Sequence, residues 1–205
     1  MTSSELFNKI NDHLIQDDSP AKYLNEISKL PIFMQYPFSM LYKEKLTEQS
    51  KRYHPEGNVW NHTLLVVNQA ALLRQKSKNP SAFMWAALLH DIGKPQTTKM
   101  RKGKITSYNH EIVGSKLAEQ FLSVFYCRYD FIAYVSSLIR WHMQILFFMK
   151  NPSFTNVSQM LKEVDIHEIA LLGYCDRTGR RGADEKVEKQ NIQLFINKIN
   201  NNLKL

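Results

Sequence analysis

The stretch Leu88-Leu89-His90-Asp91-Ile92-Gly93-Lys94 decides how this chain folds and where its chemistry lies. It completes an apolar run from Phe83 to Leu89, which predicts a buried helix that begins after Asn79 and ends by Gly93. Neighbouring helical residues do not share a face, so one target reached by both the imidazole and the carboxylate must lie at the helix end. A metal ion is such a target, although a single His-Asp pair also occurs by chance and needs further ligands to mean anything.

Length and composition indicate a globular protein with room for a real core. The chain has 205 residues, of which 43% are hydrophobic and 22% charged, so we expect one domain with helical additions. Its two cysteines, Cys127 and Cys175, are too few for a disulfide framework or a zinc finger. We see no signal peptide, and no apolar stretch that approaches the roughly 18 residues of a membrane span. The sequence therefore predicts a cytoplasmic protein with no membrane partner.

The formal charge of +8 is concentrated in two stretches. The basic residues concerned are Lys99, Arg101, Lys102 and Lys104 in the first stretch, and Arg177, Arg180 and Arg181 in the second. Such clusters can be a solvated surface or an attraction for phosphates. Both follow directly after candidate ligands, which favours phosphate.

Helical periodicity covers nearly the whole chain and predicts an all-α fold. Helices are expected over 3–16, 20–30, 38–48, 60–72, 80–91, 110–121, 128–149, 156–164, 166–175 and 184–201. The one strand-like pattern, Thr97 to Tyr108, predicts a small β-hairpin that turns at 101–104, while Pro152 and Phe154 mark a loop. We divide the chain into an N-terminal helical extension (1–50) packed on the core, a metal-binding domain (51–182) and a C-terminal helix of that domain (183–205).

Six potential metal ligands occur near the ends of the predicted helices or inside an apolar one. They are His62, His90, His110 and His142, with Asp91 and Asp176. Burying these groups is costly unless they are hydrogen-bonded or metal-bound. Six nitrogen and oxygen ligands suit two first-row ions better than one, and the lack of cysteine ligands favours iron, manganese, cobalt, nickel or magnesium. Gly114, four residues after His110, leaves room for a close approach between helices.

The order His62, His90-Asp91, Asp176 resembles that of the HD-domain metal-dependent phosphohydrolases. The sequence is most similar to the HD domain of bacterial CCA-adding tRNA nucleotidyltransferases, over roughly residues 50 to 182. The matching elements are His54-Pro55-Glu56-Gly57 with Trp60 and His62-Thr63, His90 to Pro95, Tyr108-Asn109-His110-Glu111 with Asn109 in place of glycine, and Asp176-Arg177-Thr178-Gly179-Arg180. The Gly-Ser loop and Asp-x-Asp pair of a nucleotidyltransferase head are missing, so we expect the HD part standing alone.

This resemblance implies an HD-domain helical bundle and a metal-dependent phosphohydrolase. The substrates would be phosphomonoesters or 2′,3′-cyclic phosphodiesters of nucleotides or RNA ends, attacked by a water whose pKa the metal lowers toward ~7. We assign His62, His90, Asp91 and Asp176 to one ion, and let Asp91 bridge to a second ion with His110 and His142. Asp91 and Lys94 are the candidate catalytic residues. The candidate substrate-binding residues are Lys94, Arg177, Arg180, Arg181 and His54.

Three alternatives stay open at this stage. Some HD-fold proteins use the same six ligands for a di-iron oxygenase centre. The chain could also be an RNA-binding module with a structural metal, which steeply salt-dependent binding without hydrolysis would indicate. Alarmone hydrolysis is a weaker option, because the Glu-Asp pair of that family has no clear counterpart. The sequence leaves the oligomeric state open.

Overall fold

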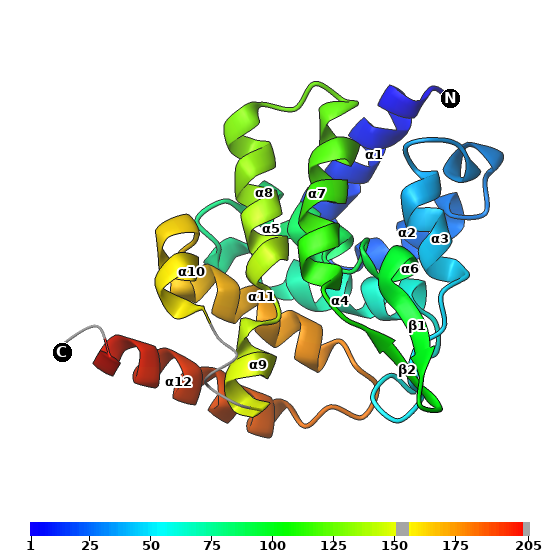
Figure 1. The fold of residues 1–205 in the computed structure, drawn as a ribbon. Coiled ribbons are helices and arrows are strands. Elements are labelled where there is room, and N and C mark those ends of the chain that lie inside the picture. The colour runs from blue at the N-terminus through cyan, green and yellow to red at the C-terminus, as the bar shows by residue number, and fades with distance from the viewer. Residues whose placement is uncertain (151–155, 203–205) are drawn as a thin grey trace.

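Helices make up most of the chain, and the strands of the described part form one hairpin (Figure 1). The computed structural model describes residues 1–150 and 156–202, so the loop expected at Pro152 and Phe154 lies outside it. The elements are α1 (Ser3–Gln16), α2 (Pro20–Ile27), η1 (Pro31–Met34), α3 (Ser39–Lys45), α4 (Val59–Leu73), η2 (Arg74–Lys76), α5 (Pro80–Leu89), α6 (Lys94–Thr97), β1 (Thr98–Arg101), β2 (Lys104–Ser107), α7 (His110–Ser123), α8 (Tyr129–Trp141), α9 (Gln144–Lys150), α10 (Val157–Glu163), α11 (Ile166–Thr178) and α12 (Glu185–Asn202). The all-α prediction with one hairpin is confirmed.

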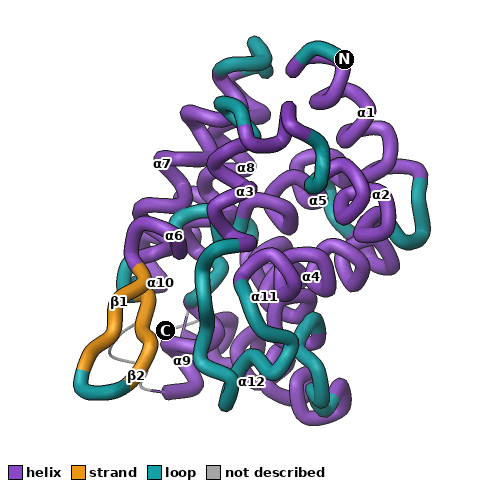
Figure 2. Tube along the Cα trace, turned by 90° about the vertical axis from the view of Figure 1, so that its right-hand side faces the viewer, coloured by secondary structure: helices purple, strands orange, loops and turns teal. Residues whose placement is uncertain are grey.

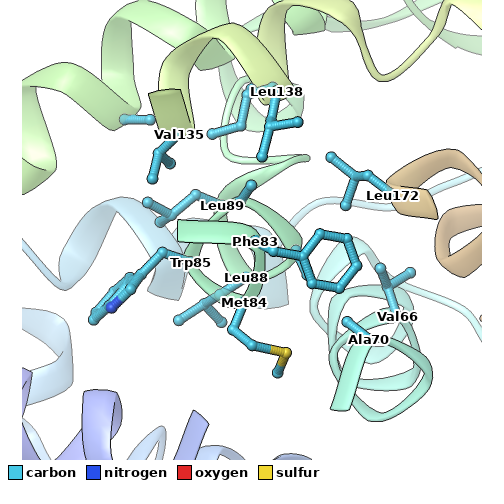
Figure 3. Close-up of a cluster of buried hydrophobic side chains, with 14 of the residues drawn as sticks. Val66, Ala70, Phe83, Met84, Trp85, Leu88, Leu89, Val135, Leu138 and Leu172 are labelled. Atoms are coloured by element: carbon cyan, nitrogen blue, oxygen red, sulfur yellow. The ribbon is translucent and has the colours of Figure 1, made fainter. Parts of the chain in front are cut away.

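Helix α5 lies at the centre of the bundle, as its continuous apolar sequence predicts. All its residues from Ala82 to Leu89 are buried. Figure 3 shows side chains from α4, α8 and α11 around it, among them Val66, Leu138 and Leu172. Each fully buried large apolar side chain stabilises the fold by roughly 1.5–3 kcal/mol. The central helix therefore holds the residues that follow it in a fixed position.

The N-terminal helices share this core. Leu6, Ile10 and Leu14 on α1 are fully buried. Phe7 stacks on Trp85 of α5 with ring centroids 4.5 Å apart. Residues 1–50 thus pack on the central helix, and their treatment as a separate extension stays a prediction.

The hairpin pairs Thr98 with Ser107 and Arg101 with Lys104 in antiparallel register. Lys102 and Gly103 connect the strands with φ values of 48° and 72°. Two consecutive positive φ values are typical of a type I′ turn, which suits the twist of a two-residue hairpin. The predicted turn is confirmed.

Several helix bounds differ from the expected ones. The helix expected over 128–149 is interrupted after Trp141, and the helix expected over 80–91 stops at Leu89. The helices expected over 20–30 and 38–48 end at Ile27 and Lys45, and the helix expected to end at 175 continues to Thr178. At the first two ends an imidazole explains the stop. The Nδ1 atoms of His142 and His90 bond the carbonyl oxygens three residues earlier, where a helix end leaves carbonyls without intrahelical partners.

The segment Tyr129–Lys150 is long and apolar enough to cross a membrane by length and composition alone, with a mean hydropathy of 1.2. The expectation that no stretch approaches that length is therefore wrong. Half of the segment's most apolar window is buried inside the protein. The interruption after Trp141 divides the segment into α8 and α9.

Candidate metal centre

The structure brings all six predicted ligands to one place. Each ligand stands at or close to a helix end, so that several helices converge on one point. They are His62 in the first turn of α4, His90 and Asp91 directly after α5, His110 at the start of α7, His142 directly after α8 and Asp176 in the last turn of α11. All six are less than a tenth exposed.

Asp91 lies between two groups of these ligands. The first group contains His62 and His90, and the second contains His110 and His142. Its Oδ2 atom is 3.2 Å from Nε2 of His90 and 3.8 Å from Nε2 of His62, and its Oδ1 atom is 3.4 Å from Nε2 of His110. The Nε2 atoms of His110 and His142 are 3.3 Å apart. One carboxylate therefore faces both groups, which is the arrangement needed to bridge two ions.

Asp176, which lies on α11, adds a carboxylate to the group that contains His62 and His90. Its Oδ1 atom lies 3.0 Å from Nε2 of His62. Arg180, one turn further on, places an Nη2 atom 3.1 Å from each oxygen of this carboxylate. Asp176 therefore reaches the centre although it is distant from the other ligands in sequence.

Three of the four histidines have their tautomer fixed by the backbone. Nδ1 of His90 lies 2.9 Å from the carbonyl oxygen of Ala87, and Nδ1 of His142 and His110 each lie 2.7 Å from the carbonyl oxygen three residues earlier. A carbonyl oxygen can only accept, so Nδ1 carries the proton and Nε2 of the neutral ring keeps its lone pair. Such a bond commonly orients a metal-ligating histidine. All three Nε2 atoms face Asp91 or one another.

The donor set fits a divalent metal ion. His62, His90 and Asp91 can each offer a ligand atom within 4.8 Å of the others, and so can Asp91, His110 and His142. Nε2 of His90 is buried without a hydrogen-bond partner among residues 1–150 and 156–202. An orphaned nitrogen in a buried site is costly unless it has a ligand to bind.

The charges of the site keep its carboxylates ionised and two of its imidazoles neutral. Burial raises the pKa of Asp91, but His90, Lys94 and His110 outweigh it and hold that pKa well below its usual value. Burial likewise raises the pKa of Asp176, and Arg180 and His62 hold it well below normal. Burial lowers the pKa of His142 to about 3, with help from the neighbouring histidines, and burial lowers the pKa of His110. These are the protonation states that metal binding requires.

Lys94 and Arg180 are the cations that the structure places beside the ligands. Nζ of Lys94 lies 2.6 Å from Oδ2 of Asp91 and donates to Oε1 of Gln49, also at 2.6 Å. Both cations line a cavity of about 610 Å³ that opens onto Asp91, His110, His142 and Asp176. His54 lines the same cavity.

The other two predicted substrate-binding arginines do not line this cavity. Arg177 pairs with Glu188 of α12. Arg181 is exposed, and its backbone N–H donates to Glu56. The structure therefore does not support a substrate contact for Arg177 or Arg181, because α11 continues past Asp176 and directs only Arg180 back toward the ligands.

Two residues of the site were given no role from the sequence. Glu56 places Oε1 3.0 Å from Nδ1 of both His54 and His62. Burial raises the pKa of this carboxyl, but the two histidines outweigh burial and lower that pKa below its usual value. Gln49 receives the Lys94 bond from a segment without periodicity. Glu56 stands inside a sequence element that resembles the family, which was the one available signal, whereas Gln49 had none.

Gly93 allows the two halves of the centre to meet. A Cβ atom at this position would lie 2.1 Å from the carbonyl oxygen of His110 and 2.6 Å from the backbone nitrogen of Gly114. No real side chain fits there, so α7 can approach the turn after α5 only with glycine at position 93. The close approach expected at Gly114 occurs here.

A helical bundle that gathers histidines and aspartates around a central His-Asp pair defines the HD-domain class, and comparison with known families agrees. The HD domain family matches residues 59–172, more than half of the chain. The chain therefore belongs to the HD domain family, a superfamily of metal-dependent phosphohydrolases.

Among individual proteins, the chain is similar to multifunctional CCA proteins. It is 38% identical to the one from Actinobacillus pleuropneumoniae serotype 5b over 106 residues, which cover 50% of this chain and 24% of that protein. It is 27% identical to the one from Pseudomonas fluorescens over 149 residues, which cover 69% of this chain and 35% of the relative. The matched regions thus span about a third or less of these relatives. The predicted relationship to the HD domain of CCA enzymes is confirmed.

Proposed function

We propose that this protein is a metal-dependent phosphohydrolase that acts on phosphomonoesters or 2′,3′-cyclic phosphodiesters of nucleotides or RNA ends. The observation that carries the proposal is the convergence of six buried residues with nitrogen and oxygen donors, Asp91 at their centre, beside a cavity that Lys94 and Arg180 help to line. His62, His90, Asp91 and Asp176 would hold one divalent ion, and Asp91, His110 and His142 a second. The bound metal would supply Lewis acidity toward a phosphoryl oxygen and an activated water.

The protein's own residues would bind and orient the phosphate. Arg180 supports this role because its Nε atom is buried without a partner among the described residues, so a donor remains for a phosphoryl oxygen. Lys94 would hold the Asp91 carboxylate in place and offset negative charge at the mouth of the ligand cluster.

The cavity also has a surface suited to a base. Met143, Leu146 and Phe147, at the start of α9 and just before it, are among the residues that line it. A pocket with one apolar wall and a few convergent polar groups is typical of small-molecule sites. A nucleoside phosphate has these two chemistries in one molecule, with an apolar face on its base and charge on its phosphate.

The test is a metal and substrate panel on the purified protein. Metal-free protein is loaded in turn with iron, manganese, cobalt, nickel and magnesium, and assayed on nucleoside monophosphates and 2′,3′-cyclic phosphates. His90→Ala and Asp91→Ala are expected to lose at least 10³-fold in kcat, the scale on which electrostatic groups act in a catalytic site. Asp12→Ala is the control, because Asp12 lies on α1 and is not one of the six candidate ligands. Unchanged turnover in either ligand variant would end the proposal, and oxygen consumption with iron in place of hydrolysis would favour the oxygenase.

A further inference from the structure

A second hollow lies directly beside the cavity of the metal centre. It has a volume of about 470 Å³ and lies between residues 48–53 and the hairpin. Five residues line both hollows, namely Gln49, Ser50, Tyr53, Ile105 and Thr106. Figure 2 shows the loop that precedes α4 running alongside the hairpin. A ligand at the metal centre can therefore continue into the second hollow without leaving the protein surface.

The second hollow is basic. Lys51, Arg52 and Lys104 line it, and Glu48 is its one acidic residue. None of the three cations forms an ion pair with any residue in 1–150 or 156–202. All three are exposed. This contrasts with Lys94 and Arg180, which are committed to carboxylates of the centre. Because no carboxylate of the described chain pairs with them, these three charges can neutralise phosphates of a ligand.

An aromatic ring stands at the junction of the two hollows. Tyr53 is 60% exposed although it lines both of them. The guanidinium of Arg52 lies 5.5 Å from the centroid of this ring. Free cations around an exposed aromatic ring are the combination that binds single-stranded nucleic acid, because the ring stacks on a base while the cations hold the backbone.

We propose that the second hollow binds the nucleotide that precedes the reacting terminal nucleotide, so that the protein prefers the 3′ end of an oligoribonucleotide to a mononucleotide. This inference rests on the proposed function, since it places the terminal phosphate at the metal centre. Lys51, Arg52 and Lys104 would contact the linking phosphodiester, and Tyr53 would stack on the penultimate base. Of the basic residues in 99–104, Lys104 would therefore face the substrate, whereas Lys99 lines neither hollow.

The experiment compares two substrates with the same reacting end. Adenosine 2′,3′-cyclic phosphate is assayed beside a tetraribonucleotide that ends in the same cyclic phosphate. The wild-type protein is expected to show about 10-fold higher kcat/KM for the tetranucleotide, since that substrate adds a stacked base and a neutralised phosphodiester to the contacts of the mononucleotide. The triple variant Lys51→Ala, Arg52→Ala, Lys104→Ala is expected to lose that preference and to change kcat/KM for the mononucleotide by less than about 2-fold.

A matched variant controls for net charge. Lys9→Ala, Lys22→Ala, Lys116→Ala removes the same three charges from exposed positions on α1, α2 and α7 that line neither hollow. It is expected to retain the preference for the tetranucleotide. An equal loss in the two triple variants, or an equal loss on both substrates in the first, overturns the proposed subsite.

A binding measurement separates this inference from the proposed function. Fluorescence anisotropy with a 5′-labelled tetranucleotide that ends in a 3′-phosphorothioate reports affinity whether or not the protein hydrolyses anything. The triple variant Lys51→Ala, Arg52→Ala, Lys104→Ala is expected to bind at least 10-fold more weakly than the wild type, with a salt slope shallower by about two. If neither cyclic phosphate is turned over but this difference is found, the hydrolytic proposal fails and the subsite stands. Equal affinity in the two proteins overturns the subsite.

Discussion

The cavity has two walls that are built in opposite ways. The inner wall belongs to the cluster of six candidate ligands, of which Asp91, His110, His142 and Asp176 line the cavity. These residues stand at helix ends, are buried, and are held by backbone carbonyls or by one another. The outer wall consists of the hairpin, residues 49–54 and α9, and exposes Tyr53, Tyr108 and several lysines. The inner wall fixes the position of its side chains, whereas the outer wall supplies exposed charges and rings. Changes to the inner wall should therefore act through geometry, and changes to the lysines and arginines of the outer wall through charge.

The largest effect is expected where backbone approaches backbone. Gly93→Ala places a methyl group 2.1 Å from the carbonyl oxygen of His110. Because this oxygen cannot move without shifting α7, we expect a loss of about 3 kcal/mol in the free energy of unfolding, at the upper end for overpacking. Gly114→Ala is the matched comparison, since its Cβ would meet a side-chain atom of Ile139 at 3.3 Å. Urea denaturation should show a clearly smaller loss for Gly114→Ala, and equal losses would contradict a backbone origin.

Glu56 should affect metal affinity more than stability. Its carboxylate lies 3.0 Å from Nδ1 of His62, the one histidine of the centre whose Nδ1 does not bond a carbonyl oxygen of the described chain. We expect Glu56→Gln to weaken metal binding about 10–100-fold, the usual effect of losing such a partner. Metal-competition titration against a chromogenic chelator measures this. Glu48→Gln, an exposed position, should leave the affinity unchanged, and an equal loss there would show that Glu56 acts only through net charge.

The inner wall could be predicted from the sequence because all of its candidate ligands except His142 belong to a recognisable local pattern. His90-Asp91 follows an apolar helix, and Asp176 comes before a Gly-spaced basic stretch. The order of the matching elements then fixes the set before any coordinates exist. The interruption after Trp141 was missed because it coincides with a local bond from Nδ1 of His142 to the carbonyl oxygen of Ile139, which hydrophobic periodicity does not report.

For the outer wall, the sequence predicts that basic residues are present but not which of them face the cavity. Arg177, Arg180 and Arg181 look equivalent in sequence, but each residue of a helix turns the side chain by about 100°. The continuation of α11 to Thr178 decides that Arg180 returns to Asp176 and that Arg177 meets α12. Gln49 and Tyr53 lie in a segment between helices, where no periodic pattern indicates which way a side chain points. Their roles follow from packing alone.

The pH dependence of the metal-free protein should reveal the neutral histidines of the cavity. The pKa of His142 is about 3 and that of His54 about 4, in both cases chiefly because of burial, against 6.5 when unfolded. The unfolded state therefore binds more protons as the pH falls below 6.5, and stability should decrease toward pH 4 by up to about 1.4 kcal/mol per pH unit for each group. Asp91 and Asp176 contribute to this slope only below pH 3.8, and His90, whose pKa is raised, only above 6.5. Burial raises the pKa of Glu44 to about 8, so Glu44 acts in the opposite sense between pH 8 and 4.5 and offsets part of the decrease.

Chemical denaturation of chelator-treated protein at several pH values measures this slope. His142→Asn should make it shallower between pH 6.5 and 4. His167→Asn, an exposed histidine on α11, is the control and should leave the slope unchanged. A slope in His142→Asn as steep as in the wild type would show that His142 is not held neutral by burial.

The smallest effect is expected at Arg181. This residue is exposed and does not line the cavity, whereas Arg180 contacts both oxygens of Asp176 at 3.1 Å. Arg181→Ala should change kcat/KM by less than about 2-fold, since exposed charges are worth little. Arg180→Ala should lower it at least 10-fold, because it leaves a buried carboxylate without its partner and removes a phosphate donor. Steady-state kinetics on a 2′,3′-cyclic phosphate measure both. Because the two adjacent arginines carry the same charge, this comparison separates the effect of side-chain position from the effect of charge. Equal losses of kcat/KM in the two variants would mean that charge alone matters at this edge of the site.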